Sequence, residues 1–479
     1  MSAPQLKLSE SEQIQKDISQ ELSYLLSQDL DFHNQSGSYS FHNFHSFPAK
    51  FPPQLPRKFI ESLTIPGEIV LDPMMGSGTT VLEAYLLGRY GIGCDIDPLA
   101  LLLTKTKITP LNSKEVSQIG NDILKRAKYS IDCNKKRLEQ LLHERFDEKT
   151  HKFVDYWFAH ETQLDLLSLI IEIERIENED IKAFFQLAFS SIIITKSGGV
   201  SLSLDLAHTR PHRAKVLIDP SGEVILGSEY LNNSSRHNDL ITKRLRSPIK
   251  DIEKRIQHNI QKLNEENSRQ IHLDSNILKE QDIPKIKPNI FFNDVQKLSF
   301  PDNSVDLIVT SPPYSHNAID YMRAHKFSLV WFGYSIESLS LKRKDYIGGE
   351  STTNIAFESL PPATSLVVDN ITTTDKTKGR SLHRYYSEMK RALIEMFRVL
   401  KSGKAAIIVV GNSIIRNHDT RIPECLSEMG ESIGFQLAKI AARTLDRNRR
   451  MLPAGSNIDR NSQIQQRMHK EYVIGLFKP

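Results

Sequence analysis

The sequence is poor in cysteine, has no long apolar run and carries no large excess of either charge. Its three cysteines, Cys94, Cys133 and Cys425, are too few and too scattered for a disulfide framework or a four-ligand zinc site. The N-terminal segment is polar, and no run reaches the roughly 18 apolar residues of a membrane-spanning helix. We therefore expect neither secretion nor membrane association, but a cytoplasmic protein in a reducing environment.

The composition is that of a folded globular protein with nearly balanced charge. Of 479 residues, 39% are hydrophobic, and 62 basic residues stand against 58 acidic ones, for a net charge of +4. Total charge therefore does not indicate a nucleic-acid partner. One segment differs: residues 443–470 contain seven basic and two acidic residues. A long loop of this kind is either a solvated surface or a phosphate-binding segment, and we favour phosphate contacts by Arg443, Arg447, Arg449 and Arg450.

Seven segments have the pattern of short strands. The first, residues 67–72, is followed by a glycine-rich turn and a helical stretch, and the second, 89–95, comes directly afterwards. This order predicts a βαβ unit and therefore an α/β fold built on a parallel sheet. The other strands are expected at 289–294, 304–311, 403–412, 434–444 and 471–477.

The turn after the first strand has the features of a ligand site. Gly76 and Gly78 let backbone N–H groups approach a ligand, and the helix start that follows favours a negative group. Asp72 offers a carboxylate for a cationic amine, and Asp95 ends the second strand, where open α/β sheets bind ribose hydroxyls. The turn matches neither the dinucleotide fingerprint nor a P-loop. It suits a ligand with an amino-acid end and a nucleoside end, although similar turns also occur without a ligand.

A second motif, TSPPY, directly follows the fourth expected strand. Pro312 and Pro313 fix their φ angles and lack N–H donors, which leaves rigid carbonyl acceptors beside the Ser311 hydroxyl. Tyr314 adds an aromatic face. Acceptors for an exocyclic NH₂ group beside an aromatic surface are what an unstacked nucleic-acid base requires.

Together the motifs resemble those of the S-adenosylmethionine-dependent DNA amino methyltransferases, the N4-cytosine/N6-adenine family. DPMMGSGTT (72–80) resembles the family's methionine-binding loop, and GCDID (93–97) resembles its ribose-binding strand end. NDV (293–295) resembles the adenine-binding strand end, and TSPPY (310–314) the catalytic motif. FHNFHSFPAKFPP (41–53) resembles the element that closes over the methionine end of the cofactor. The resemblance covers about residues 31–110 and 289–479. It implies a Rossmann-like seven-stranded methyltransferase sheet enlarged by an insertion.

The resemblance also assigns roles to individual residues. Those implied to bind S-adenosylmethionine are Phe47, Lys50, Asp72, Pro73, Gly76, Gly78, Thr79, Asp95 and Asp294. The implied catalytic residues are Ser311, Pro312, Pro313 and Tyr314: the serine hydroxyl and the first proline carbonyl would accept the target amine, and the tyrosine would stack on the flipped base. Such a transfer needs no metal. His42 and His45 have the spacing of metal ligands, but no matching pair accompanies them, so we expect no metal site.

The resemblance and the element pattern suggest four parts of the chain. Residues 1–30 are expected to form an N-terminal helical extension, 31–110 the cofactor-binding first half, 111–288 a mostly helical insertion, and 289–479 the catalytic second half. Within the last part, the Ser/Thr-rich stretch 335–380 is predicted to be a mobile loop and 443–470 a basic loop. The insertion departs from the family pattern in its position, so target recognition, dimerisation and a scaffold role all stay open for it.

The expected function is site-specific methylation of cytosine N4 in double-stranded DNA, because SPPY leans toward cytosine within the family. N6-adenine methylation is the alternative. An RNA guanine-N2 methyltransferase and a catalytically dead DNA-binding regulator fit less well, since the chain shows no RNA-binding module and its motifs are intact. The resemblance further implies a restriction-modification system with a cognate endonuclease, and a nucleoid-associated location in the cytoplasm. The sequence indicates no oligomeric state.

Overall fold

The computed structural model describes most of the chain. The described ranges are 10–33, 35–47, 50–206, 211–231, 241–276, 287–315, 320–349, 355–445 and 470–479. Three predicted phosphate-binding residues, Arg447, Arg449 and Arg450, lie outside the described residues. Within these ranges, no helix is both long and apolar enough to cross a membrane.

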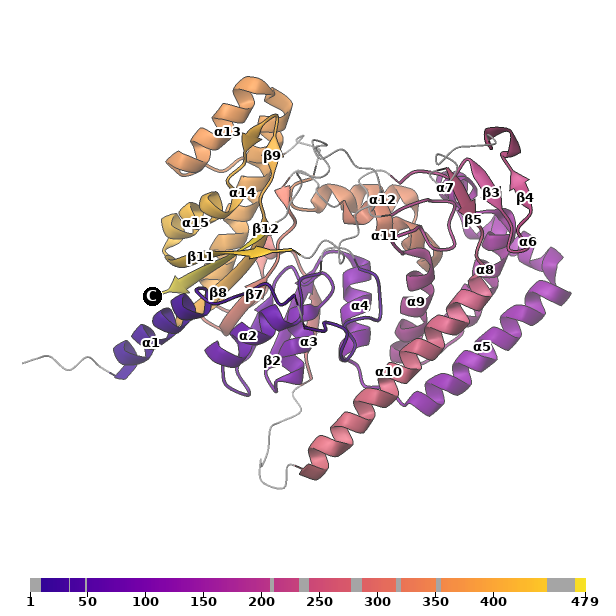
Figure 1. The fold of residues 1–479 in the computed structure, drawn as a ribbon, viewed down its shortest axis with the longest axis horizontal. Helices are drawn as coiled ribbons and strands as arrows, with labels where there is room; N and C mark the ends of the chain where they lie inside the picture. Colours follow the sequence, from indigo (N-terminus) through magenta and orange to yellow (C-terminus); the bar gives the residue numbers. More distant parts are fainter. Residues whose placement is uncertain are drawn as a thin grey trace, which may run out of the picture.

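A central sheet of seven strands organises the described chain (Figure 1). Its strand order is β11-β12-β8-β7-β1-β2-β6, and neighbouring strands are parallel except β12, which is antiparallel to both β8 and β11. The strands are β1 (Ile69–Asp72), β2 (Tyr90–Asp95), β6 (Asn289–Phe292), β7 (Val305–Thr310), β8 (Leu400–Gly411), β11 (Gln436–Thr444) and β12 (Lys470–Lys478). They correspond to the seven predicted strands, and the predicted α/β fold class is confirmed.

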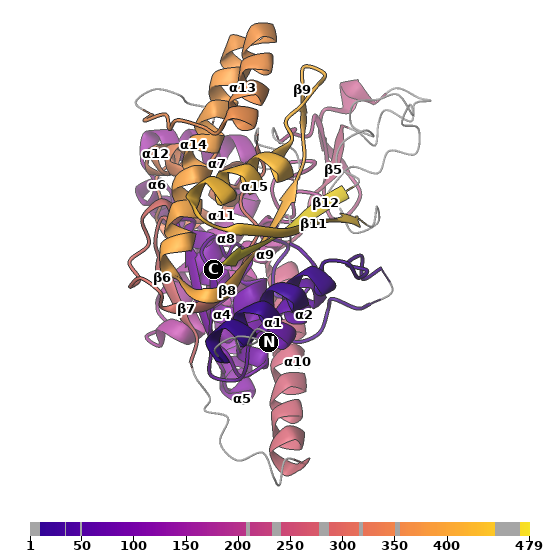
Figure 2. The ribbon, with the colours of Figure 1, turned by 90° about the vertical axis from the view of Figure 1, so that its left-hand side faces the viewer.

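Helices cover both faces of this sheet (Figure 2), and apolar residues alternate between the two faces. Val70 and Leu307 belong to the core on one face, whereas their chain neighbours Leu71 and Ile308 belong to the core on the other. Burial on both faces explains why these strands read as continuous apolar runs. The first face is covered by α1 (Glu10–Leu25), α2 (Gln54–Leu63), α3 (Thr79–Leu86) and α4 (Pro98–Ile108), and the second by α14 (Lys376–Val399) and α15 (Ile422–Ile433).

The insertion between β2 and β6 is mostly helical and lies to the right of the sheet in Figure 1. Its helices beyond α4 are α5 (Ser113–Cys133), α6 (Lys135–Arg145), α7 (Glu148–Trp157), α8 (His160–Glu174), α9 (Glu179–Ile193) and α10 (Pro248–Asn276). A small sheet of order β4-β3-β5 lies between α9 and α10 in the chain, and the sequence analysis did not expect it. Its strands are β3 (Val216–Ile218), β4 (Val224–Leu226) and β5 (Thr242–Arg244).

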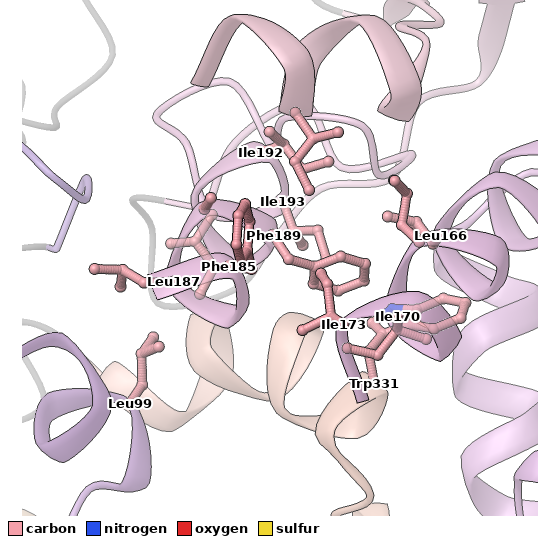
Figure 3. Packing of buried hydrophobic residues seen from close by; sticks show 14 of the residues in the cluster. Leu99, Leu166, Ile170, Ile173, Phe185, Leu187, Phe189, Ile192, Ile193 and Trp331 are labelled. Carbon is pink, nitrogen blue, oxygen red and sulfur yellow. The ribbon is translucent and has the colours of Figure 1, made fainter. Parts of the chain in front are cut away.

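One apolar core joins the insertion to the sheet domain (Figure 3). Trp331, in the short helix η5 (Val330–Phe332), is fully buried. Its ring packs edge-on against Phe146 and Phe158 of the insertion, with centroids 5.4 Å and 5.7 Å away. Leu99 of α4 and Phe189 of α9 belong to the same cluster. The insertion therefore shares its core with the rest of the protein and is not a separate domain joined by a linker.

The stretch 335–380 contains helices, where the sequence analysis predicted a mobile loop. The prediction was wrong because it relied on composition, which is rich in serine and threonine. Among the few apolar residues, Val367 and Ile371 recur at helical spacing and are buried. Residues 350–354 lie outside the described residues. The elements here are α12 (Ile336–Lys342), η6 (Arg343–Asp345), α13 (Pro362–Thr374) and the start of α14, and a ribbon of β9 (Ile414–Ile415) and β10 (His418–Asp419) follows β8.

Trp331→Ala should lower the free energy of unfolding by about 3–5 kcal/mol, because the tryptophan fills space between two parts of one core. Urea denaturation followed by circular dichroism measures the loss, and we expect a single transition. Leu341→Ala is the control: this α12 side chain is 57% exposed, so its loss should change the free energy of unfolding by less than about 0.5 kcal/mol. Two separate transitions, or a loss no larger than that of the control, would contradict the shared core.

Candidate active site

A cavity opens at the carboxyl ends of β1 and β7, where the strand order of the sheet reverses. Open α/β sheets bind ligands at this point. The cavity encloses about 830 Å³ when the open space at its mouth is included. The predicted residues that line it are Phe47, Lys50, Asp72, Pro73, Gly76, Thr79, Asp95, Asp294, Ser311 and Pro313. The fold thus brings the glycine-rich turn and the TSPPY motif to one cavity.

The turn between β1 and α3 requires glycine at two positions. Gly76 and Gly78 have φ angles of +45° and +69°, in the left-handed region that favours glycine. A Cβ atom on Gly78 would lie 2.4 Å from Thr104 Oγ1 on α4. Gly78 therefore permits close packing of α3 against α4 and is not among the lining residues, whereas Gly76 is. The turn presents the N-terminus of α3 to the cavity, where backbone N–H groups favour a negative ligand group.

Asp72 and Asp95 place two carboxyl groups in the cavity wall. Asp72 is 2% exposed and accepts a hydrogen bond from the Thr310 hydroxyl at 2.7 Å, and burial raises its pKa to about 6. Asp95 accepts hydrogen bonds from the backbone N–H groups of Gly76 at 2.8 Å and Asp97 at 2.9 Å. Burial, followed by the charge of Asp97, raises the pKa of Asp95 to about 7. Both carboxyls therefore change charge near neutral pH.

Asp97 anchors a buried hydrogen-bond network that the sequence analysis did not identify. Its Oδ2 lies 2.6 Å from Nδ1 of His325 on α11 (Tyr321–Leu329) and accepts the Tyr346 hydroxyl at 2.9 Å. Its Oδ1 accepts the backbone N–H of Leu99 at 2.7 Å and so caps α4. Burial acts to raise the pKa of Asp97, but the contacts with His325 and Tyr346 outweigh it, and the pKa is lowered. The network ties the end of β2 to the helix after the TSPPY motif.

Tyr321 and Tyr346 line the cavity, and neither was predicted. A signal existed for α11, because Tyr321 and His325 are four residues apart, the spacing that places two side chains on one helix face. Tyr346 had no such signal. It lies in the stretch predicted to be a loop, and its partner Asp97 is 249 residues away along the chain.

Phe47 and Lys50 bring the N-terminal segment to the cavity. The Phe47 ring stacks on the Tyr321 ring, with centroids 5.7 Å apart and planes at 27°. The Lys50 ammonium donates hydrogen bonds to the backbone carbonyls of His42 at 3.0 Å and His45 at 2.7 Å, and burial lowers its pKa to about 8. The segment thus supplies an aromatic ring and a cation to one side of the cavity.

His42 and His45 have separate partners in this structure. His42 Nε2 lies 2.7 Å from Glu83 Oε1 on α3, and the Tyr39 hydroxyl donates to the same oxygen at 2.7 Å. His45 Nε2 lies 3.0 Å from the Ser190 hydroxyl on α9. The two imidazoles therefore fasten the N-terminal segment to two different helices. Among the described residues, no group of three or more His, Cys, Asp or Glu is placed to hold a metal ion.

The end of β6 forms the far wall of the cavity. Asp294 and Asn293 follow this edge strand, and both line the cavity. Asp294 also accepts the backbone N–H of Gln296 at 2.9 Å and so caps the short helix η3 (Val295–Lys297). The carboxyl ends of β1, β2, β6 and β7 thus all contribute to one site, as expected for parallel strands.

The TSPPY motif meets the cavity on the β7 side. Ser311 and Pro313 line it, whereas Pro312 is buried and Tyr314 is half-buried outside the lining. The Tyr314 hydroxyl donates a hydrogen bond to Glu471 Oε1 at 2.8 Å. Burial, followed by the negative charge of Glu471, raises the pKa of Tyr314 well above its usual value. The phenol is therefore neutral at physiological pH.

Arg443 does not present its charge to a surface, which corrects its prediction as a phosphate contact. Strand β11 extends to Thr444, so Arg443 belongs to the sheet and stands opposite Glu471 on β12. Its side chain is 4% exposed, and Nη1 lies 2.9 Å from Glu471 Oε2. The ion pair neutralises the charge of Arg443, one of the seven basic residues of 443–470.

The comparisons with known proteins point to one family. A family model described as DNA methylase, for N6 and N4 methyltransferases, matches residues 5–106, which include the glycine-rich turn and Asp95. The type II methyltransferase M.MvaI of Kocuria varians is 26% identical over 412 residues, covering 81% of this chain and 80% of that protein. The type II methyltransferase M.BsoBI of Geobacillus stearothermophilus is 23% identical over 445 residues, covering 84% and 80%.

Solved structures add no weight to this comparison. The crystal structure of a Thermus thermophilus protein, provisionally described as a DNA modification methylase and complexed with S-adenosyl-L-methionine, is 18% identical to this chain. Its TM-score is 0.21, and the match covers 39% of this chain and 51% of that one. The two relatives, by contrast, align over more than four fifths of this chain and extend far beyond the range of the family model. The glycine-rich turn and the TSPPY motif face one cavity in a sheet of this topology. Together with the matches above, this confirms the resemblance to the S-adenosylmethionine-dependent DNA amino methyltransferases of the N4-cytosine/N6-adenine family.

Proposed function

We propose that the protein is a site-specific DNA methyltransferase that moves a methyl group from S-adenosylmethionine to the exocyclic N4 amine of cytosine in double-stranded DNA. The observation that carries the proposal is the shared cavity, lined by the carboxyls of Asp72 and Asp95 and by Ser311. Methyl transfer between a small cofactor and a base requires the two to meet in one oriented complex, and orientation supplies most of the rate.

The residues of the cavity fit S-adenosylmethionine from end to end. At the α3 side, the Asp72 carboxyl suits the cationic amine, and the helix N-terminus with Lys50 suits the carboxylate. Following the resemblance, Asp95 would accept the ribose hydroxyls and Asp294 the adenine amine. The bound cofactor would supply a methyl group on a sulfonium centre.

The task of the protein residues is then to hold the target amine toward that methyl group. In this proposal the Ser311 hydroxyl and the Pro312 carbonyl accept the two N–H groups of the amine, which orients the nitrogen lone pair for in-line attack. Proline has no N–H to compete for these acceptors. The Tyr314 ring would stack on the flipped base.

Cytosine is proposed over adenine because the motif reads SPPY, and N6-adenine is the alternative that uses the same geometry. The names of M.MvaI and M.BsoBI contain "type II methyltransferase", which supports a role in a restriction-modification system with a cognate endonuclease as partner. Double-stranded DNA in the cytoplasmic nucleoid is the substrate and location that this role implies.

Ser311→Ala should lower kcat by roughly 10–100-fold, because it removes one hydrogen bond that orients the reacting amine. The affinity for S-adenosylmethionine, measured by calorimetry, should stay within about twofold because the cofactor contacts are intact. Turnover is measured as transfer of labelled methyl to unmethylated genomic DNA, which is then digested to nucleosides. The matched control is Ser340→Ala, at an exposed position of α12.

Full turnover by Ser311→Ala would contradict the assigned role of Ser311. Label in N6-methyldeoxyadenosine would show that the target base is adenine and not cytosine, and it would leave the assignment of the site residues unchanged. Label in N4-methyldeoxycytidine is the expected product.

The affinity for S-adenosylmethionine should rise as the pH rises through about 7, because the pKa of Asp95 is raised to about 7 and its ionised form is the better acceptor for two hydroxyls. Calorimetry between about pH 6.5 and 7.5 is the measurement, because Asp72, with a pKa of about 6, and Lys50, with a pKa of about 8, titrate mainly outside this range. Asp95→Asn should bind about tenfold more weakly at the upper pH and lose this rise. Asp122→Asn, at an exposed position of α5, should keep the wild-type profile; an unchanged profile in Asp95→Asn would contradict the role of Asp95.

A further inference from the structure

The tyrosine of the TSPPY motif is bound to a buried ion pair. Tyr314 donates to Oε1 of Glu471 at 2.8 Å, and Arg443 Nη1 donates to Oε2 at 2.9 Å. Each carboxylate oxygen therefore has its own donor. Glu471 is 8% exposed and Arg443 is 4% exposed, so both hydrogen bonds form where water competes little and where charge-assisted bonds are strong.

Sheet topology explains how the ion pair reaches the motif. Because β12 is antiparallel to β8, its first residues lie at the same edge as the carboxyl ends of β7 and β8. Glu471 pairs with Arg443 on β11 and with Gly411 on β8. Gly411 has no side chain, and β8 is the strand between β12 and β7. Glu471 thus contacts Tyr314 across the end of β8.

We propose that Glu471 and Arg443 are positioning residues that hold the ring of Tyr314 in the plane on which the target base stacks. The inference rests on the proposed function, in which this ring contacts the base. Rotation about χ1 moves the tyrosine hydroxyl, so a strong hydrogen bond to a fixed acceptor restricts this torsion. The hydroxyl oxygen lies on the χ2 axis, but a phenolic O–H prefers the plane of its ring, so the same acceptor favours one ring plane. Arg443 donates to the other carboxylate oxygen and holds Glu471 in place, so that the hydroxyl of Tyr314 has one fixed acceptor.

A purely structural role is the competing explanation, and the chemistry of the pair argues against it. A buried ion pair stabilises a fold little more than an apolar pair of similar volume, and often less. A third group, the Tyr314 hydroxyl, uses the second carboxylate oxygen. Glu471 accepts hydrogen bonds from both Arg443 and the tyrosine of the TSPPY motif. This arrangement is better explained by the orientation of the Tyr314 ring than by the stability of the fold.

A double-mutant cycle tests the proposal. Tyr314→Phe removes only the hydroxyl, and Glu471→Gln keeps the shape of the side chain but removes its charge. Each should lower kcat for methyl transfer to unmethylated genomic DNA by about tenfold, the effect of one charge-assisted hydrogen bond. The variant with both changes should be no slower than the slower single variant, because both remove the same contact. The affinity for S-adenosylmethionine should stay within about twofold in all three.

The controls separate loss of positioning from loss of folding. Glu148→Gln breaks a carboxylate–lysine pair with Lys152 whose side chains are 82% and 74% exposed, and it should leave turnover unchanged. Because Glu471→Gln leaves Arg443 buried without its counter-charge, Glu471→Gln/Arg443→Gln serves as a second variant with neither charge. It should show the same loss of turnover as Tyr314→Phe.

Two results would overturn the proposal: wild-type turnover in Glu471→Gln, or a loss in the Tyr314→Phe/Glu471→Gln variant equal to the product of the two single losses. If the wild-type protein transfers no methyl group to DNA, the proposed function fails on its own. The contact is then tested by thermal unfolding of the wild-type protein, Tyr314→Phe, Glu471→Gln and the variant with both changes. Additive shifts in Tm would show that Tyr314 and Glu471 are not coupled and would overturn the proposal.

Discussion

The pairing of β1 with β7 is the interaction on which the site depends. These strands come from distant parts of the chain, and their parallel register sets Leu71 beside Ile308. The next residues bring the Thr310 hydroxyl 2.7 Å from Asp72, a contact that spans 238 residues of sequence. Without this pairing, the glycine-rich turn and the TSPPY motif would end different strands with no common edge. With it, the two motifs line one cavity, where the proposed function places the cofactor and the target amine.

Around this edge, carboxylates hold aromatic side chains in place. Asp97 binds His325 and Tyr346 just beyond the end of β2, and Glu471 binds Tyr314 at the start of β12. Burying such carboxylates is unfavourable unless donors surround them, so each network fixes the positions of its partners as well as satisfying the charge. The same burial brings the titration of Asp72 and Asp95 close to neutral pH. The burial of carboxylates therefore accounts both for the fixed positions of the side chains at this site and for the raised pKa values of Asp72 and Asp95.

Local patterns made much of this structure predictable. Each of the seven strands, the turn at Gly76 and the motif at Ser311 is a continuous stretch of sequence that can be recognised locally. Because the carboxyl ends of parallel strands share one edge of a sheet, the sequence also predicts that the turn and the motif lie close together. The pairs Asp97–Tyr346 and Arg443–Glu471 could not, because nothing near either residue in the sequence indicates its partner. Composition was a poor guide at 335–380, where tertiary packing makes helices of a stretch rich in serine and threonine.

The central claim, that this edge of the sheet methylates cytosine N4 in DNA, is tested most directly in a methylation-free bacterial host. The protein is expressed there, and the genomic DNA is sequenced by a method that separates N4-methylcytosine from N6-methyladenine. We expect N4-methylcytosine at one defined motif across the genome. Genomic DNA without any methylated base, from cells in which the protein is folded and binds S-adenosylmethionine, would contradict the claim.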